Sequence, residues 1–336
     1  MQPVGEAKAG EHCRAVNRLI RSLFTNSVGC FVTLATESTL KNTMRSFVLL
    51  IGVLLTASCK LEIKSGDAQF ASDPTVAPVT PGQIDEASGL ADSRSQPGNL
   101  WVEQDSGSPA ELALLGYDGK IKGKITITGA TNRDWEEMTI GPGPQAGVNY
   151  LYIGDIGDNN AQYPAYQIYR LPEPASVQAT VTGVERINYR YPDGARDAEA
   201  MFVDPQTKDI YIISKREEKV HLYRLNYPQN INEVTVAEAL GELPIGGGLA
   251  NYVTAAAVSP DGSEILVRTY SQLYYWKRSS GQSIADALQR GSSRQLVVRL
   301  EPQGEAVCFD KDAKGFFTIS ERASSPSVNL YYYVRK

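Results

Sequence analysis

Acidic side chains open most of five similar segments of the chain, and they are the residues best suited to chemistry. The segments span residues 86–90, 136–140, 199–203, 254–258 and 305–309, and their starts lie 50 to 63 residues apart. Carboxylate oxygens without His or Cys suit a hard cation such as Ca²⁺. We therefore expect a Ca²⁺ site wherever these segments meet. The expected metal ligands are Glu86, Glu136, Glu199, Glu305, Asp155 and Asp158; the fourth segment opens with Thr254 instead.

A second group of charged residues follows the segment starts at intervals of 14 to 19 residues. Its first members are acidic, the middle ones are basic, and the last is an adjacent acid and base. A face with both charges could bind a small anionic molecule, a phosphate or carboxylate, directly or through the metal, or a protein partner. The expected ligand-binding residues are Asp105, Lys215, Arg268, Glu321 and Arg322.

Catalysis is an alternative use of the same side chains. With a bound metal, the reaction would be hydrolysis of a phosphate ester or a lactone. The candidate general bases are Glu136, Glu199 and Asp155, and Arg268 or Lys215 would stabilise the anion. His221 lies in a regular strand pattern, so the sequence does not favour a Ser-His-Asp triad.

Two interpretations without chemistry stay open. Like charges about 6 Å apart repel by roughly 3 kcal/mol, so the glutamates could pair with basic residues in a buried ionic ring. The candidate partners are Arg133, Arg196, Lys215, Arg268 and Arg322. The protein could equally be a scaffold whose faces bind other proteins.

Composition excludes several classes of function. The chain has 33 Lys and Arg against 38 Asp and Glu, a formal net charge of −5, which disfavours nucleic acid as a partner. Its two His and four Cys show no zinc-ligand spacing, and the sequence contains no CxxC, GxGxxG or P-loop motif. We therefore expect no nucleotide or redox cofactor.

Strand patterns predict how the acidic positions come together. Each segment is followed by a turn, a second strand and a third strand, and the third strand contains Tyr in four of the five repeats. A fourth strand is visible in four repeats. Four strands per repeat of about 50 residues is typical of a β-propeller, whose first strands line an axis. We predict an all-β propeller of five four-stranded antiparallel blades over residues 84–336, with six blades as the alternative. The last repeat stops after three strands, so a strand from residues 60–84 would close the ring. Residues 283–290 predict a short helix.

The first 83 residues carry export signals. Met44 is followed by a basic residue, a short apolar run and small residues before Cys59, as in a secretory signal peptide. This segment resembles the signal of bacterial lipoproteins, which implies removal of residues 44–58 and lipidation of Cys59. Residues 59–83 then predict a flexible tether to the membrane, and residues 1–43 a mis-annotated or non-native leader. We expect a monomer anchored in the cell envelope, in the periplasm or at the outer membrane of a Gram-negative cell.

Several segments also resemble a known group of proteins. Residues 86–90, 100–107, 134–137 and 150–159 resemble uncharacterised exported β-propeller proteins of bacteria. That group is loosely similar to esterase-like and phytase-like propellers and to calcium-dependent lactonase propellers. The resemblance implies a propeller over most of residues 84–336. The lactonase pattern carries Asn and Asp besides one Glu, whereas the axial positions here are mostly Glu.

Overall fold

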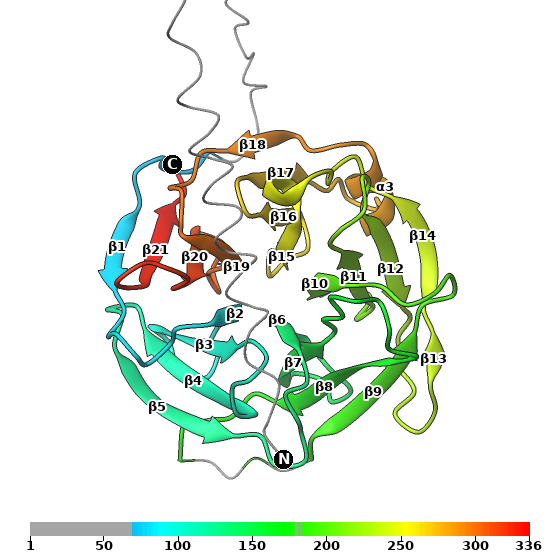
Figure 1. The fold of residues 1–336 in the computed structure, drawn as a ribbon, viewed down its shortest axis with the longest axis horizontal. Coiled ribbons are helices and arrows are strands. Elements are labelled where there is room, and N and C mark those ends of the chain that lie inside the picture. The colour runs from blue at the N-terminus through cyan, green and yellow to red at the C-terminus, as the bar shows by residue number, and fades with distance from the viewer. Residues whose placement is uncertain (1–68, 179–180, 182) are drawn as a thin grey trace, which may run out of the picture. The chain divides into compact units, whose positions relative to one another are not determined.

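The computed structural model describes residues 69–336 except 179, 180 and 182. Five β-sheets surround a common axis (Figure 1). Within each sheet, neighbouring strands along the chain pair antiparallel. The predicted all-β propeller of five four-stranded blades is confirmed, and the described part of the chain contains no sixth blade.

The blades follow one another along the chain. Blade one is β2 (Ala87–Asp92), β3 (Asn99–Gln104), β4 (Glu111–Gly116) and β5 (Ile121–Thr126). Blade two is β6 (Trp135–Pro142), β7 (Asn149–Asp155), β8 (Tyr166–Pro172) and β9 (Glu185–Arg190). Blade three is β10 (Ala198–Val203), β11 (Ile210–Ser214), β12 (His221–Leu225) and β14 (Glu238–Glu242). Blade four is β15 (Val253–Val258), β16 (Glu264–Thr269), β17 (Leu273–Lys277) and β18 (Arg294–Leu296). Blade five begins with β19 (Gln303–Phe309), β20 (Gly315–Glu321) and β21 (Asn329–Val334).

A strand from the N-terminal side closes the ring. β1 (Thr75–Pro78) pairs antiparallel with β21, with Thr75 opposite Tyr332, and becomes the outer strand of blade five. Closure by a strand from residues 60–84 is therefore confirmed. Because β1 falls within the range expected to form a tether, the propeller begins before residue 84.

Short elements decorate the rim of the ring. The expected helix is α3 (Ile284–Gln289), which Ser283 caps by accepting the N–H of Asp286 on its hydroxyl. A 3₁₀ turn, η1 (Leu249–Asn251), precedes blade four. The two-residue strand β13 (Thr235–Val236) pairs in parallel with β9 and adds an unexpected fifth strand to blade two.

Apolar side chains are buried between the blades. Five clusters lie one at each junction of neighbouring sheets, and three large members are Trp101, Trp135 and Trp276. A single blade has two apolar faces and cannot bury both alone, so stacking around the axis supplies the stabilising burial. This packing holds the inner strands at fixed separations.

Each inner strand carries a bulge near its start. The pairing with the second strand skips Glu136, Glu199, Thr254 and Glu305 in blades two to five. A bulge adds a residue to one strand only and redirects its side chain. The repeated acidic positions therefore occupy equivalent, irregular points at one end of the axis.

The predicted signal peptide, the lipidation site Cys59 and residues 59–68 of the tether lie outside the described residues. Among the residues that the structure describes, no helix has the length and apolar character needed to cross a membrane.

Ring closure by β1 is testable by truncation. A chain beginning at Gly82 loses the four pairs of β1 and the buried Val79, which belongs to the core between blades five and one. We expect a loss of roughly 3 kcal/mol or more in the free energy of unfolding, which lowers the melting temperature by about 5 °C or more. A chain beginning at Gln69 is the control, and equal melting curves for the two would contradict closure by β1.

Candidate functional site

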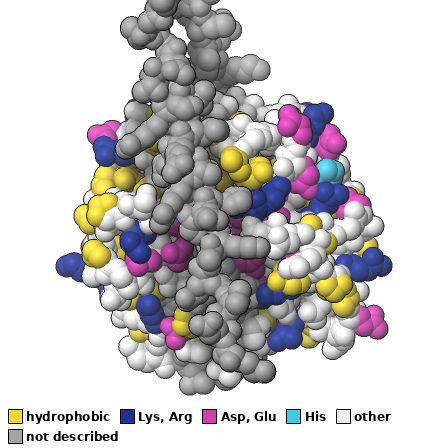
Figure 2. All heavy atoms as spheres, viewed as in Figure 1, with side chains coloured by type: hydrophobic (Ala, Val, Ile, Leu, Met, Phe, Trp, Pro, Cys, Tyr) yellow, Lys and Arg dark blue, Asp and Glu magenta, His cyan; other side chains and the backbone are white. Residues whose placement is uncertain are grey.

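The candidate site is the end of the axis where the inner strands begin. Each second strand runs antiparallel to the first and therefore ends at the same place. Polar side chains from all five blades interact here, and on the face drawn in Figure 2 acidic and basic groups lie among apolar ones. We call the following residues the axial mouth: Asp105, Asp134, Glu136, Asp197, Glu199, Lys215, Tyr270, Glu305 and Glu321.

Glu86 does not take the position predicted for it. In blade one the bulge falls on Ser88 and Gly89, so Ser88 corresponds to Glu136 of blade two. Glu86 lies two residues before Ser88, at the blade-one position equivalent to Asp134 of blade two. Its side chain is exposed. Asp134, rather than Glu86, lies next to Glu136, while the charge of Glu86 helps raise the pKa of Glu321.

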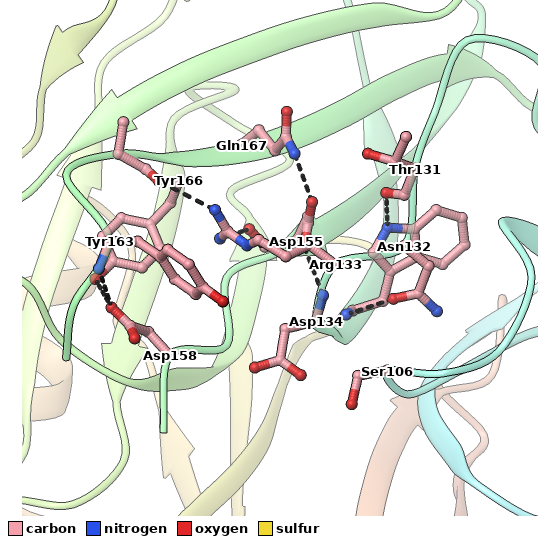
Figure 3. A network of polar contacts seen from close by, with 12 residues as sticks. Ser106, Thr131, Asn132, Arg133, Asp134, Asp155, Asp158, Tyr163, Tyr166 and Gln167 are labelled. Carbon is pink, nitrogen blue, oxygen red and sulfur yellow. Dashed lines mark hydrogen bonds and ion pairs between the residues drawn. The ribbon is translucent and has the colours of Figure 1, made fainter. Parts of the chain in front are cut away.

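Three carboxylates from blades one and two converge. Asp105 follows β3, while Asp134 and Glu136 lie at the start of β6, and one oxygen from each lies within 4.8 Å of the others. The backbone N–H of Asp134 donates to Asp155 Oδ1 at 2.9 Å (Figure 3). A Cβ at Gly157 would collide with Glu136 Oε1 and Asp134 Oδ2. The missing side chain at position 157 therefore leaves room for both carboxylates.

A second group shares Glu136 and extends into blade three. Oxygens of Glu136, Asp197 and Glu199 also lie within 4.8 Å of one another, and all three residues are buried. Asp197 Oδ1 accepts the backbone N–H of Asp158 at 2.8 Å. Glu199 Oε1 pairs with Lys215, whereas Glu199 Oε2 is buried with no hydrogen-bond partner in the described structure. Such an oxygen costs free energy unless a cation or water satisfies it.

Lys215 is a buried cation at the mouth. The residue is buried, pairs with Glu199, and lies with its Nζ 5.2 Å from the ring centroid of Tyr270. Its charge opposes the rise in the pKa of Glu136 and of Glu305. Arg216 pairs with Asp197. These two cations cannot neutralise all the surrounding carboxyls, so the mouth favours a further cation or bound protons.

Burial and mutual repulsion raise the pKa values of these carboxyls. Burial is the main cause for Glu136, whose pKa lies well above its usual range. Burial and the charge of Asp105 raise the pKa of Asp134 to about 6. Burial raises the pKa of Glu305 to about 7, and burial with the neighbouring Glu305 raises that of Glu321 to about 9. The mouth therefore mixes protonated and ionised carboxyls near neutral pH.

Blade five contributes the last acidic pair of the mouth. Gln303 Nε2 donates to Glu305 Oε1 at 2.9 Å and to Glu321 Oε2 at 2.7 Å. Gln303 is the blade-five counterpart of Asp134, because both lie two residues before the bulge residue. In blade five the Gln303 side-chain amide therefore bridges Glu305 and Glu321, whereas the equivalent position in blade two is occupied by the acid Asp134.

The acids of the loop after β7 hold that loop in place. Asp155 is buried and accepts the Asp134 N–H on one oxygen and Gln167 Nε2, at 2.6 Å, on the other. Asp158 accepts two backbone N–H groups and the hydroxyl of Tyr166 at 2.8 Å (Figure 3). These contacts give both acids a structural role in holding the loop, and the metal-ligand role of both and the general-base role of Asp155 stay predictions.

The basic residues expected to bind an anion are engaged elsewhere. Arg268 is buried and donates to Glu301 Oε1 at 2.7 Å and to a backbone carbonyl. Arg322 Nε lies 3.2 Å from Asp85 Oδ1, so this guanidinium pairs with Asp85. Of the five predicted partners of the axial glutamates, Lys215 alone forms such a pair within the described residues.

Asp197, Glu103 and Glu301 are among the buried acids that the sequence analysis did not identify as site residues. Asp197 had a signal: Arg-Asp-x-Glu occurs at residues 133–136 and again at residues 196–199. Glu103 is fully buried, and neither of its carboxylate oxygens has a hydrogen-bond partner in the described structure. Glu301 pairs with Arg268. Neither Glu103 nor Glu301 lies in a repeated position, so no sequence pattern marks them.

Comparisons with known proteins found similar solved structures only. No protein-family model matches the chain, and no curated protein matches its sequence. Similar solved structures include the WD40 repeats of RRP9, at 10% identity and a TM-score of 0.42, covering 80% of this chain and 100% of that one. An auxiliary nutrient binding protein from Bacteroides thetaiotaomicron has 10% identity and a TM-score of 0.44, covering 78% of this chain and 77% of that one. The propeller assignment rests on the strand pairing described above.

The raised pKa of Glu305 predicts a pH dependence. The folded state holds the proton of this carboxyl more tightly than the unfolded state, so stability falls as pH rises from about 4 through about 7, by on the order of 3 kcal/mol. Glu305→Gln cannot ionise and should flatten this part of the curve, measured by urea unfolding across pH. Glu111→Gln, on the surface of blade one, is the control. Unchanged pH dependence in Glu305→Gln would contradict the assignment.

Gly157 provides a test of crowding at the mouth. Its φ is not in the left-handed region, so Gly157→Ala is tolerated by the backbone, but the new methyl group collides with Glu136 and Asp134. We expect a loss of about 1–3 kcal/mol in the free energy of unfolding. Gly141→Ala, on the inner strand β6 of the same blade, where the methyl group meets Val203 at 3.2 Å, should cost less. Equal costs for the two substitutions would show that the carboxylates do not crowd residue 157.

Proposed function

We propose that this protein is a binding propeller of the bacterial cell envelope, tethered through lipidated Cys59, whose axial mouth holds Ca²⁺ and with it a ligand or partner. The ligand class that fits is a small anionic, oxygen-rich molecule. The tether and the export route rest on the sequence pattern before residue 60. The metal and the ligand rest on the axial mouth.

One observation carries the proposal: oxygens of Asp105, Asp134 and Glu136, from two blades, lie within 4.8 Å of one another. Ionised carboxyls this close repel, and the pKa of each is raised. The nearby cation Lys215 is already paired with Glu199. A divalent cation would lower the free energy of this arrangement by satisfying all three acids together.

The donor set indicates which cation fits. All three side chains offer carboxylate oxygens, the ligands that hard cations prefer, and no described His or Cys joins them. Ca²⁺ accepts irregular geometry with six to eight oxygens, whereas Mg²⁺ demands a near-ideal octahedron. The unpartnered Glu199 Oε2, beside the same Glu136, supports a cation at this place.

The ligand would meet the metal and Lys215 together. Arg268, Arg322 and Arg216 are paired with Glu301, Asp85 and Asp197, so an anion at the mouth depends on the cation and on the Lys215 ammonium. The aromatic ring of Tyr270 lies beside this ammonium. An anionic ligand would therefore bind only when the metal has reversed the local negative charge.

Hydrolysis of a phosphate ester or lactone is the second candidate, and one observation favours it. Burial places the pKa of Asp134 at about 6, in the range suited to a general base near neutral pH. A bound Ca²⁺ would supply Lewis-acid activation of water. The chain would supply Asp134 or Glu136 as proton acceptor. A panel of lactones and phosphate esters, assayed with Ca²⁺ or EDTA, tests this candidate; turnover that survives Asp134→Asn would exclude Asp134 as the base.

Metal binding at the mouth has a direct thermal test. Ca²⁺ at about 100 times its dissociation constant should add about 2.7 kcal/mol to the free energy of unfolding and raise the melting temperature by about 5–10 °C. Asp134→Asn and Glu136→Gln should abolish the shift, and EDTA should reverse it. Asp118→Asn, an exposed acid paired with Lys122, is the matched control. No shift in the unsubstituted protein would remove the metal from the proposal.

A further inference from the structure

A second cavity lies on the face of the ring opposite the axial mouth. It has a volume of about 360 Å³, within the range of small-molecule sites. It sits between blades five and one, which are neighbours in the ring (Figure 1). The loop joining β19 to β20 and the residue after β4 border it, and both lie where the inner strands end. The cavity is therefore separate from the axial mouth.

Three aromatic rings form one wall of this cavity. The ring centroid of Phe317 lies 4.6 Å from that of Tyr117 and 4.6 Å from that of Tyr332. Phe317 is buried, whereas Tyr117 is 37% exposed and Tyr332 is half-buried. The two tyrosine rings are therefore the part of the wall that a ligand can contact most readily.

Buried carboxylates occupy the hydroxyl groups of both tyrosines. The Tyr117 hydroxyl donates to Asp92 Oδ1 at 2.6 Å, and the Tyr332 hydroxyl donates to Asp310 Oδ2 at 2.6 Å; both acids are buried. Burial, and then the hydrogen bond to the carboxylate, raises the pKa of each tyrosine, so both hydroxyls stay protonated and keep donating. A ligand therefore meets the carbon surface of these rings, which packs against C–H groups.

The charged groups around the cavity balance one another. The lining contains two lysines and two acids, so its formal charges sum to zero: Lys311, Lys314, Asp310 and Asp312. Asp92 lies outside the lining, and there the positive charge of Arg94 opposes the rise in the pKa of this acid. Because no charge is left over, the cavity favours a ligand without net charge.

The rim offers hydrogen-bond donors and acceptors side by side. Lys311 Nζ donates to both oxygens of Asp312 at 2.9 Å, and Lys314 Nζ donates to Asp312 Oδ2 at 3.4 Å. An ammonium group has three N–H bonds and a carboxylate about four acceptor sites, so these contacts leave both kinds of group for a ligand. Asp312 and Lys314 are exposed. A hydroxyl group both donates and accepts, so neighbouring hydroxyls can use both partners.

We propose that this cavity binds one ring of an uncharged sugar. The C–H face of the sugar would lie against Tyr117 and Tyr332, and its hydroxyls would bond to Asp312 and Lys314. A sugar joins an apolar face to several hydroxyl groups and carries no charge. A plain cyclic alcohol lacks the further hydroxyls, and a sugar acid adds a charge that the balanced lining does not offset.

Isothermal titration calorimetry with the methyl glycosides of glucose, galactose and mannose tests the proposal. We expect saturable one-to-one binding of at least one of them. For the sugar that binds best, the uronic acid and the protonated 2-amino sugar should each bind about threefold weaker, because each brings an unbalanced charge. Cyclohexanol, which has a ring of the same size and one hydroxyl, should bind about tenfold weaker.

Substitutions separate the ring contact from the hydrogen bonds. Tyr117→Leu removes the ring face and should weaken binding about tenfold, whereas Tyr117→Phe keeps the face and should change the affinity less than threefold. Asp312→Ala, on the exposed rim, tests the site without touching the packed wall and should weaken binding about fivefold.

Two controls keep this site apart from others. Glu242→Ala removes an exposed acid that is likewise paired with a lysine, Lys219, but lies outside the cavity lining, and it should leave binding unchanged. Glu136→Gln, at the axial mouth, should also leave it unchanged. Absence of binding by all three glycosides would overturn the proposal, as would a charged sugar or cyclohexanol that binds as tightly as the parent glycoside. An unchanged affinity in Tyr117→Leu or in Asp312→Ala would also overturn it.

Discussion

Burial of carboxyl groups where five sheets meet is the interaction on which the rest of this structure depends. Taking a charge out of water is costly unless a partner compensates it. At the axial mouth the compensation is incomplete: Lys215 pairs with Glu199, and Glu305 and Glu321 share the amide of Gln303. The remaining acids keep raised pKa values or recruit a cation. The excess of buried carboxyls over paired cations destabilises the fold locally. The same excess of negative charge would favour binding of a cation at this end of the axis.

The fold imposes this imbalance through features that have nothing to do with charge. Apolar clusters between neighbouring blades hold the inner strands at fixed separations, and the bulges direct one side chain per blade to the axis. Below the mouth, Glu137 accepts the N–H groups of Met138 and of Ala256, which joins blade two to blade four. The acids cannot move apart without unpacking the ring, so the molecule presents a preorganised set of oxygens.

Much of the fold is predictable from sequence because repeats and alternating strands encode it locally. The five blades, closure by an N-terminal strand and the helix over residues 284–289 all follow from such patterns. The site is less accessible, because bulges and partner choice decide it. Glu86 matches the other segments in sequence, but the bulge in blade one falls on Ser88 and Gly89 and leaves Glu86 exposed. The pairing of Arg268 with Glu301 depends on contacts across blades that no spacing rule reveals.

Glu136 and Glu199 were placed at the axis by sequence, whereas Asp197 emerged only from the structure. We propose that Asp105, Asp134 and Glu136, from blades one and two, form one cation site. The most direct measurement is an anomalous-difference map from crystals of the protein grown with Ca²⁺. The account predicts one strong peak between Asp105, Asp134 and Glu136. A map with no peak there, and with those carboxyls bonded only to Lys215 and water, would contradict it.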